Sequence, residues 1–246
     1  MATILTPLPS RGFDPSETGI PWRVLSDLGH RIVFATPDGL PGVADKMMVT
    51  GQGLGLLASL LKADQNGCEA HDAMVASSEF CSPLSYEAIA GLSFDALLLS
   101  GGHAKEMKPY LESPLLQRVV VECFARVKPV GAICHGVVLA ARSKAPSGKS
   151  VLHGRKTTAL LRTQELMAWS LTRLYLDDYY RTYPVTVEDE VRAALAQPDD
   201  FRPGPLSIVR DTPKRPNGFA VIDRKYVSSR WRGDAYGFSR ALAGLL

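Results

Sequence analysis

Cysteine is scarce in this sequence. Only four cysteines occur in 246 residues, at positions 68, 81, 123 and 134, and no two of them form a Cys-x-x-Cys pair. No group of cysteines and histidines has the spacing of a zinc site. This usage argues against a disulfide-stabilised secreted domain and against a structural metal site, so we expect no metal and no other cofactor. A reducing compartment, the cytoplasm, fits it best.

Long apolar runs and an excess of charge are also missing. No unbroken apolar stretch approaches the roughly 20 residues that span a bilayer, and residues 1–13 lack the apolar segment of a secretion signal. The formal net charge is only +3, and the basic residues are scattered among acidic ones. We therefore expect neither a membrane nor a nucleic acid as a partner.

The apolar runs that do occur alternate with helical patterns. Residues 2–5 and 31–35 have the composition of strands, and residues 20–28 between them have helical spacing. The continuous apolar run from Phe94 to Leu99 is typical of a central strand that is buried on both faces. The sequence therefore predicts an α/β fold: a three-layer sandwich around a mainly parallel sheet.

The same alternation continues to the end of the chain. Ser113-Pro114 suits a helix start, and the segments after it predict a strand at 129–133, a helix at 136–142, a hairpin at 219–229 and a closing helix at 234–245. Two segments with weaker patterns, 41–84 and 179–217, look like insertions that form a cap or rim. We expect one domain over residues 1–246.

Cys134 is the candidate nucleophile. It lies at the short junction between the strand at 129–133 and the helix at 136–142, with the small residues Ala132 and Gly136 two positions to either side. Small neighbours are what a strained nucleophile elbow requires. The backbone N–H of His135, at the start of the helix, would face the sulfur and is expected to lower the pKa of the thiol.

A second loop is expected to meet this elbow. Gly101-Gly102 follows the predicted central strand, and glycines there allow the N–H of Gly102 or His103 to approach a reacting carbonyl oxygen. The two loops would then provide one oxyanion site between them.

These motifs together resemble the ThiJ/PfpI superfamily. Gly131 to Gly136 is similar to its cysteine signature, and the likeness extends over segments 34–39, 100–103, 152–156 and 226–230 in the same order. The resemblance implies a flavodoxin-like fold of the class I glutamine amidotransferase type and a homodimer. It also implies that Glu17, four residues before Pro21, hydrogen-bonds the sulfur and that His135 is the candidate base.

The third member of the catalytic group is left open by the resemblance. Glu106 matches the position from which protease-like members send a glutamate across a subunit interface, and Glu165 is a later alternative that reads more simply as a solvated helix charge. His103 is expected to line the pocket, and His153 to be structural, on a strand. The three tyrosines at 179, 180 and 183 read as a packed cluster, with pocket lining as the alternative.

Three functions follow from the resemblance. The first is a lyase of the glyoxalase III type that converts methylglyoxal to lactate without metal or glutathione, through attack of Cys134 on the aldehyde. The second is a cysteine peptidase or amidase acting on short peptides or amides. The third is a redox-responsive stress protein or chaperone in which Cys134 is oxidised without turnover. The presence of Glu17 favours the first.

Overall fold

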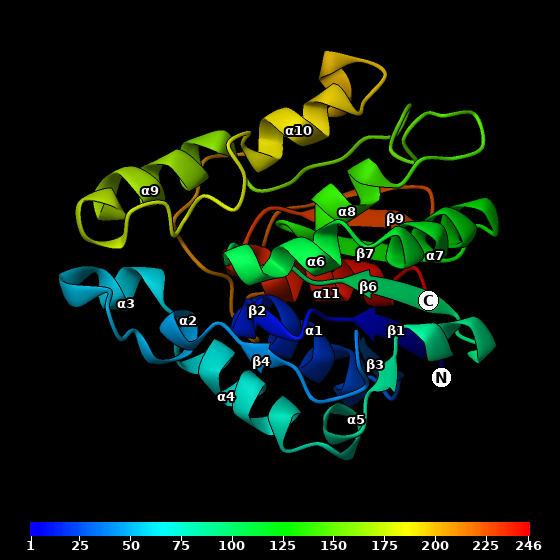
Figure 1. Cartoon of the computed structure of the whole chain (residues 1–246), viewed down its shortest axis with the longest axis horizontal. Coiled ribbons are helices and arrows are strands. Elements are labelled where there is room, and N and C mark those ends of the chain that lie inside the picture. The colour runs from blue at the N-terminus through cyan, green and yellow to red at the C-terminus, as the bar shows by residue number, and fades with distance from the viewer.

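The structure, a computed structural model that describes residues 1–246, is organised around a seven-stranded sheet in the order β5-β3-β1-β6-β7-β9-β8 (Figure 1). All neighbouring strands are parallel except β8, which pairs antiparallel with β9. The strands of this sheet are β1 (Thr3–Pro7), β3 (Arg31–Thr36), β5 (Leu84–Ser85), β6 (Ala96–Leu99), β7 (Val130–Ile133), β8 (Ala220–Asp223) and β9 (Tyr226–Ser229). A separate pair joins β2 (Arg11–Phe13) to β4 (Val43–Ala44).

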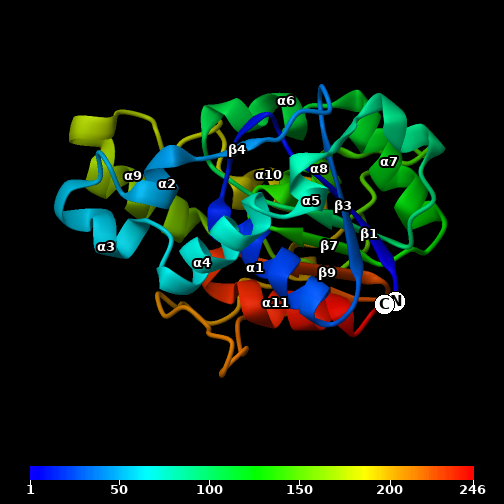
Figure 2. The ribbon, with the colours of Figure 1, turned by 90° about the horizontal axis from the view of Figure 1, so that it is seen from below.

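Helices cover both faces of the sheet. Helices α1, α4 and α11 pack together on one side, and α6, α7 and α8 lie on the other (Figure 2). None of the helices is long and apolar enough to cross a membrane. Their bounds are α1 (Pro15–Asp27), α2 (Lys46–Thr50), α3 (Ala58–Leu61), α4 (Gln65–Val75), α5 (Ser78–Cys81), α6 (Lys108–Leu111), α7 (Pro114–Ala125), α8 (Gly136–Arg142), α9 (Arg162–Leu176), α10 (Val187–Ala193) and α11 (Ala235–Ala243).

This arrangement confirms the predicted three-layer, mainly parallel fold. The inner strands β3-β1-β6-β7-β9 have the flavodoxin order, 2-1-3-4-5, with β5 and β8 added at the two edges. All four residues of β6 are buried, as its continuous apolar run predicted. In such sheets, ligands bind outside the carboxyl ends of the strands. In this chain, the loops that follow β6, β7 and β9 begin at that edge.

Helix starts follow their capping residues. The Ser113 hydroxyl accepts from the N–H of Leu116, and α7 begins at Pro114 as the sequence indicates. Helix α1 begins earlier than the apolar spacing suggested, at Pro15, because Asp14 accepts from the N–H groups of Ser16 and Glu17. The strand expected at His153 is wrong: Leu152 and His153 lie in a hydrogen-bonded turn after α8.

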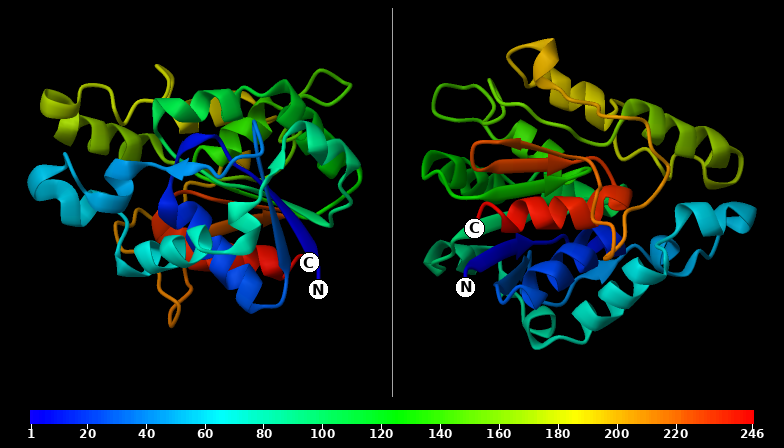
Figure 3. Two further views of the ribbon diagram at one scale, coloured as in Figure 1. Left: turned by 60° about the horizontal axis from the view of Figure 1, so that its bottom comes forward. Right: turned by 180° about the vertical axis from the view of Figure 1, so that it is seen from behind.

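Two helices reach past the carboxyl ends of the strands, at the end of the molecule away from both termini (Figures 1 and 3). Helix α3 belongs to the segment 41–84, which the sequence read as an insertion. Helix α9 lies just before the other such segment, 179–217, and was not expected to take part in a cap. Together with residues around Ile208 they line a pocket above the sheet.

Arg230 ties part of segment 179–217 to the core. Its side chain is 1% exposed, and its Nε and Nη2 donate to the two carboxylate oxygens of Asp234 at 2.8 and 3.0 Å. Its Nη1 donates to the carbonyl oxygens of Pro203 and Pro205. The guanidinium therefore joins the end of β9, the start of α11 and the chain that leads to the pocket rim.

Replacing Arg230 is expected to be strongly destabilising. Arg230→Leu leaves the Asp234 carboxylate buried without its partner, and losing one member of a buried pair costs about 3–5 kcal/mol. Urea unfolding should show this loss. Arg126→Leu is the control, because the Arg126–Glu122 pair is exposed at 3.9 Å and such pairs contribute about 0–1 kcal/mol. Equal effects of the two substitutions would contradict the role given to Arg230.

Candidate active site

Cys134 occupies a strained turn between β7 and α8. Its φ is +56°, a left-handed conformation that is uncommon for a residue with a side chain. Gly136 makes the turn possible, since a side chain at that position would run into the carbonyl oxygen of Leu99 at the end of β6. The structure thus has the elbow geometry that the sequence indicated, and Cys134 lies in the wall of the pocket.

The loop after β6 passes directly against the elbow. A side chain at Gly101 would stand 2.7 Å from the Cβ of Cys134 and would collide with the Oε2 of Glu17. The Gly101 carbonyl accepts from the N–H of Asp14, which joins this loop to the start of α1. Glycine at position 101 is therefore what allows the thiol and the Glu17 carboxyl to share one small space.

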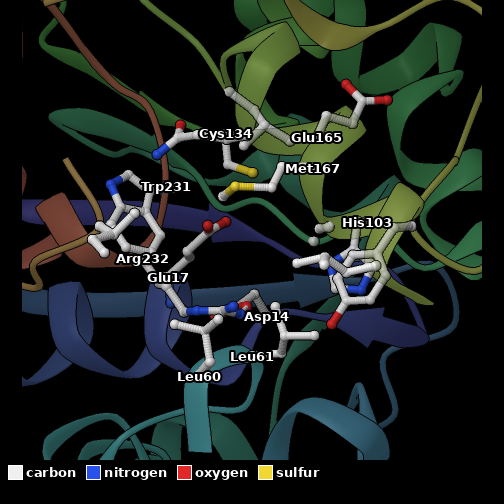
Figure 4. A pocket seen from close by; sticks show the side chains of 17 residues that line it. Asp14, Glu17, Leu60, Leu61, His103, Cys134, Glu165, Met167, Trp231 and Arg232 are labelled. Atoms are coloured by element: carbon white, nitrogen blue, oxygen red, sulfur yellow. Dashed lines mark hydrogen bonds and ion pairs between the residues drawn. The ribbon is translucent and has the colours of Figure 1, made fainter. Parts of the chain in front are cut away.

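Glu17 points into the pocket beside Cys134 (Figure 4). It is 3% exposed, and its Oε2 is buried with no hydrogen-bond partner. Burial first, and then the negative charge of Asp14, raise the pKa of Glu17 well above its ordinary value, while the Arg232 charge and the Cys134 thiol act in the opposite direction. Glu17 therefore keeps a proton available next to the sulfur.

The expected lowering of the thiol pKa is wrong. Burial, followed by the charges of Glu17 and Asp14, raises the pKa of Cys134, and the N–H of His135 only partly offsets them. Two acidic groups so close together in a buried site oppose each other's ionisation, and this outweighs the N-terminus of the short helix α8. The resting site holds protons on these groups until a base removes one.

His135 lies next to the thiol. Its side chain is buried, and its Nδ1 lies 3.4 Å from the Cys134 sulfur. Burial, with smaller effects of the His103 and Arg142 charges, lowers the pKa of His135 to about 3, so the ring is neutral at physiological pH.

Thr182 determines which nitrogen of His135 carries the proton. The Thr182 hydroxyl donates its one hydrogen to the carbonyl oxygen of His103 at 2.5 Å. Its oxygen lies 3.0 Å from the His135 Nε2, and it can only accept there. The Nε2 therefore holds the ring proton, and the Nδ1 presents its lone pair to the thiol.

Neither candidate third acid contacts His135. Glu106 is exposed and lies beside Gly12 in β2. Glu165 is not a solvated charge: it is 3% exposed, accepts from the N–H of Val187 at 2.9 Å and pairs with Arg181 at 3.4 Å. Burial raises the pKa of Glu165 to about 7, against the effects of these two partners. Within this chain, the position of a third acid is taken by the Thr182 hydroxyl.

His103 lines the pocket and belongs to an aromatic cluster. Its ring stacks on Tyr180 at 4.4 Å and meets the edge of Tyr179 at 4.9 Å. Its Nε2 is buried without a hydrogen-bond partner. Gly102, before it, has a φ of +153° and also lines the pocket, and its N–H makes no backbone hydrogen bond. Tyr180 both packs in this cluster and lines the pocket, whereas Tyr183 does neither: its hydroxyl donates to Glu112 and its ring faces Arg142.

Sequence reasoning missed four residues of the site. Asp14 positions Glu17 and accepts from Arg232 at 3.2 Å, and both Arg232 and Trp231 line the pocket. The signal for Asp14 was present, as an aspartate before Pro15 at a helix start. Trp231 and Arg232 follow directly after the family-like segment 226–230. Thr182 lies in the least patterned part of the chain, where no signal pointed to it.

The cavity has room for a small molecule. Its volume is about 230 Å³, and it reaches from the Cys134 thiol outward between α3 and α9. No group of three or more histidine, cysteine, aspartate or glutamate side chains is arranged to hold a metal ion. The thiol has the Glu17 carboxyl and the His135 imidazole beside it, and Asp14, His103 and Glu165 also line the cavity.

Comparison with known proteins decides the family. The model of the family described as ThiJ/PfpI family-like matches residues 8–205. The chain belongs to the ThiJ/PfpI family. The resemblance seen in the sequence is thereby confirmed.

Individual ThiJ/PfpI relatives are distant. The curated protein "Deglycase TK1284" of Thermococcus kodakarensis is 27% identical over 163 residues, which cover 66% of this chain and 69% of that protein. Among solved structures, glyoxalase III of Candida albicans matches 100% of this chain and 97% of its own at 16% identity and a TM-score of 0.68. The 24 kDa Rapid Encystment Protein of Francisella tularensis matches 100% and 99% at 17% identity and a TM-score of 0.69. At these identities the structures establish a shared fold.

The raised pKa of Glu17 predicts a pH-dependent stability. Above its ordinary value of 4.5, the unfolded chain loses this proton while the folded chain keeps it, so stability falls as pH rises towards the folded pKa. Glu17→Gln removes the titration. The stability of the variant relative to wild type should therefore rise with pH by up to about 1.4 kcal/mol per pH unit.

Urea unfolding of both proteins between pH 5 and pH 8 checks this expectation. Taking the difference between them removes the contribution of other buried acids, such as Glu165. Glu106→Gln is the matched control, because its exposed side chain has similar surroundings in both states. Parallel pH curves for wild type and Glu17→Gln would show that Glu17 is not held protonated.

Proposed function

We propose that this protein is a cysteine-dependent enzyme for small carbonyl compounds, which converts a 2-oxoaldehyde such as methylglyoxal to the 2-hydroxy acid. The observation that carries the proposal is the placement of Cys134 between two proton carriers: the neutral Nδ1 of His135 at 3.4 Å and the buried carboxyl of Glu17. A glyoxalase III among the solved structures of the same fold supports it. Cytoplasmic location and a homodimer remain predictions.

The first step forms a carbon–sulfur bond. The sulfur of Cys134 attacks the aldehyde carbon as its proton moves to the Nδ1 of His135. The aldehyde oxygen takes a proton from the Glu17 carboxyl, and the product is a hemithioacetal. The unpaired N–H of Gly102 lines the same pocket and is suited to polarise the aldehyde oxygen.

The second step moves hydrogen from one carbon to the next. The Glu17 carboxylate removes the proton from the carbon bonded to sulfur while the His135 imidazolium returns its proton to the ketone oxygen, giving an enediol. Glu17 then gives its proton to the neighbouring carbon as His135 takes the O–H proton from the sulfur-bearing carbon, which gives a thioester of the 2-hydroxy acid. Water then hydrolyses the thioester, which releases the acid and restores the thiol. One water is consumed, and the oxidation of one carbon balances the reduction of the other.

Peptide or amide hydrolysis is the second candidate. The curated relative is named a deglycase, and this name is consistent with bond-cleaving chemistry in the family. Amide cleavage of the protease type relies on a histidine oriented by a carboxylate. Here the Nε2 of His135 is bound by the neutral Thr182 hydroxyl, which favours the less demanding attack on an aldehyde. The redox role left open by the sequence needs oxidation of Cys134 alone and predicts no turnover.

Lactate formation tests the proposal. Purified protein supplied with methylglyoxal, without glutathione, should produce lactate, and Cys134→Ala should produce none because the carbon–sulfur bond cannot form. Cys123→Ala is the control, since that buried thiol lies on α7 away from the pocket. Inactive wild-type protein would overturn the lyase proposal, and cleavage of a model amide by the same sample would favour the hydrolase.

Thr182 is expected to act as a positioning residue. Thr182→Val removes the acceptor for the Nε2 proton of His135 and frees the ring to take the other tautomer. A neutral hydrogen bond contributes about 0.5–1.5 kcal/mol, so kcat should fall by roughly twofold to tenfold. The pH profile of kcat should change as well, because the base is no longer fixed.

Thr182→Ser is the matched control for this substitution. It keeps the hydroxyl and should recover most of the activity and the original pH profile. Equal losses in the serine and valine variants would indicate that the Thr182 methyl group, through packing, is what matters.

A further inference from the structure

Unpaired polar atoms gather around the pocket. Across the whole chain, twelve buried side-chain nitrogen and oxygen atoms lack a hydrogen-bond partner. Six of these belong to residues that line this one cavity. Buried polar groups are normally paired, so the donors among these six atoms mark a place where a ligand's oxygens can bind. The six atoms are Glu17 Oε2, His103 Nε2, Gln164 Oε1, Tyr180 Oη, Trp231 Nε1 and Arg232 Nε.

The outer part of the same pocket is apolar. Its wall comes from α3, from α9, from Leu160 two residues before α9, and from the chain near residue 208. Figure 4 shows Met167, Leu60 and Leu61 among the side chains that line this pocket. The apolar residues of this wall are Leu60, Leu61, Leu160, Met167, Ala168, Leu171 and Ile208.

No charged side chain on this wall is free to bind a ligand. Glu165 is the one ionisable residue on it, and both of its oxygens are engaged, by the N–H of Val187 and by Arg181. The amide nitrogen of Gln164 already donates to the carbonyl of Ser207, and its Oε1 is the one unpaired polar atom on this wall. Apart from that oxygen, a ligand leaving the thiol between α3 and α9 meets carbon atoms.

We propose that the preferred substrate is a 2-oxoaldehyde carrying an apolar group of several carbons, either an alkyl chain or an aromatic ring. Its two carbonyl oxygens accept from the unpaired donors of the pocket, Trp231 Nε1 and Arg232 Nε, and its apolar group lies against the outer wall. This inference rests on the proposed lyase function and adds the substrate class. The single methyl of methylglyoxal would leave most of that wall uncovered.

The wall also argues against a peptide as the long part of the substrate. A peptide carries an amide in every residue, and each amide needs a donor and an acceptor along its path. The seven apolar side chains of the wall provide neither. An alkyl or aryl group needs no such partners and gains from leaving water.

A series of substrates tests the proposal with the full-length chain. We expect kcat/KM to rise from methylglyoxal through propylglyoxal to pentylglyoxal, by about fourfold for each methylene that becomes buried. Phenylglyoxal should exceed methylglyoxal by at least tenfold. Turnover is measured as the 2-hydroxy acid formed, with Cys134→Ala as the blank in every case.

A pair of variants on α9 places the selectivity in the wall. Leu171 lines the pocket and is 48% exposed, whereas Leu174 on the same helix is 93% exposed and does not line it. Leu171→Asp should lower the ratio of kcat/KM for pentylglyoxal to that for methylglyoxal at least fivefold. Leu174→Asp, the matched control, should leave the ratio at its wild-type value.

The possible failures are distinguishable. If methylglyoxal is turned over through Cys134 but kcat/KM is flat or falls along the series, the substrate class is overturned and the lyase function stands. If no member of the series is turned over, both are overturned. If kcat/KM rises along the series but Leu171→Asp and Leu174→Asp change the pentylglyoxal-to-methylglyoxal ratio equally, the proposed wall is not the site of selection.

Discussion

The close contact between two loop backbones is the constraint on which this site depends. The loop after β6 and the elbow after β7 approach so closely that neither Gly101 nor Gly136 can carry a side chain. That contact leaves the thiol of Cys134 facing the carboxyl of Glu17, whose own position is set by the Asp14 cap of α1. Adjacent parallel strands release these loops at the same edge of the sheet, so the central fold brings the groups together before any insertion is considered.

The electrostatic state of the site follows from its burial. Desolvation disfavours the charged form of every acid and base placed there, so Glu17 keeps its proton and His135 stays neutral. Asp14 and Arg232 are the charged exception, and they pair with each other at 3.2 Å. In the proposed first step, His135 becomes positively charged and Glu17 negatively charged on either side of Cys134, so the two new charges partly offset each other.

The sequence was informative where local patterns and the fold agree. Apolar runs located β6 and β7, capping residues located α7, and small neighbours located the elbow at Cys134. The sequence did not predict the features that depend on contacts between residues far apart in the chain. Nothing in the local pattern around Glu165 reveals that Arg181 and the start of α10 will bury it. The thiol pKa depends on the burial of the elbow and on its contact with Glu17 and Asp14, which are distant from Cys134 in the sequence.

Thr182 lies outside the flavodoxin-like core, in a poorly patterned loop, yet it fixes the proton of a histidine that belongs to the core. The residues that act on the reacting groups are therefore not confined to the flavodoxin-like core. The segment outside the core contributes to the chemistry as well as to the shape of the pocket. A chimera that exchanged segment 179–217 for that of another family member would inherit a new partner for His135 together with a new pocket rim. Selectivity and reactivity would then change in one step, which limits how freely such segments can be recombined among related enzymes.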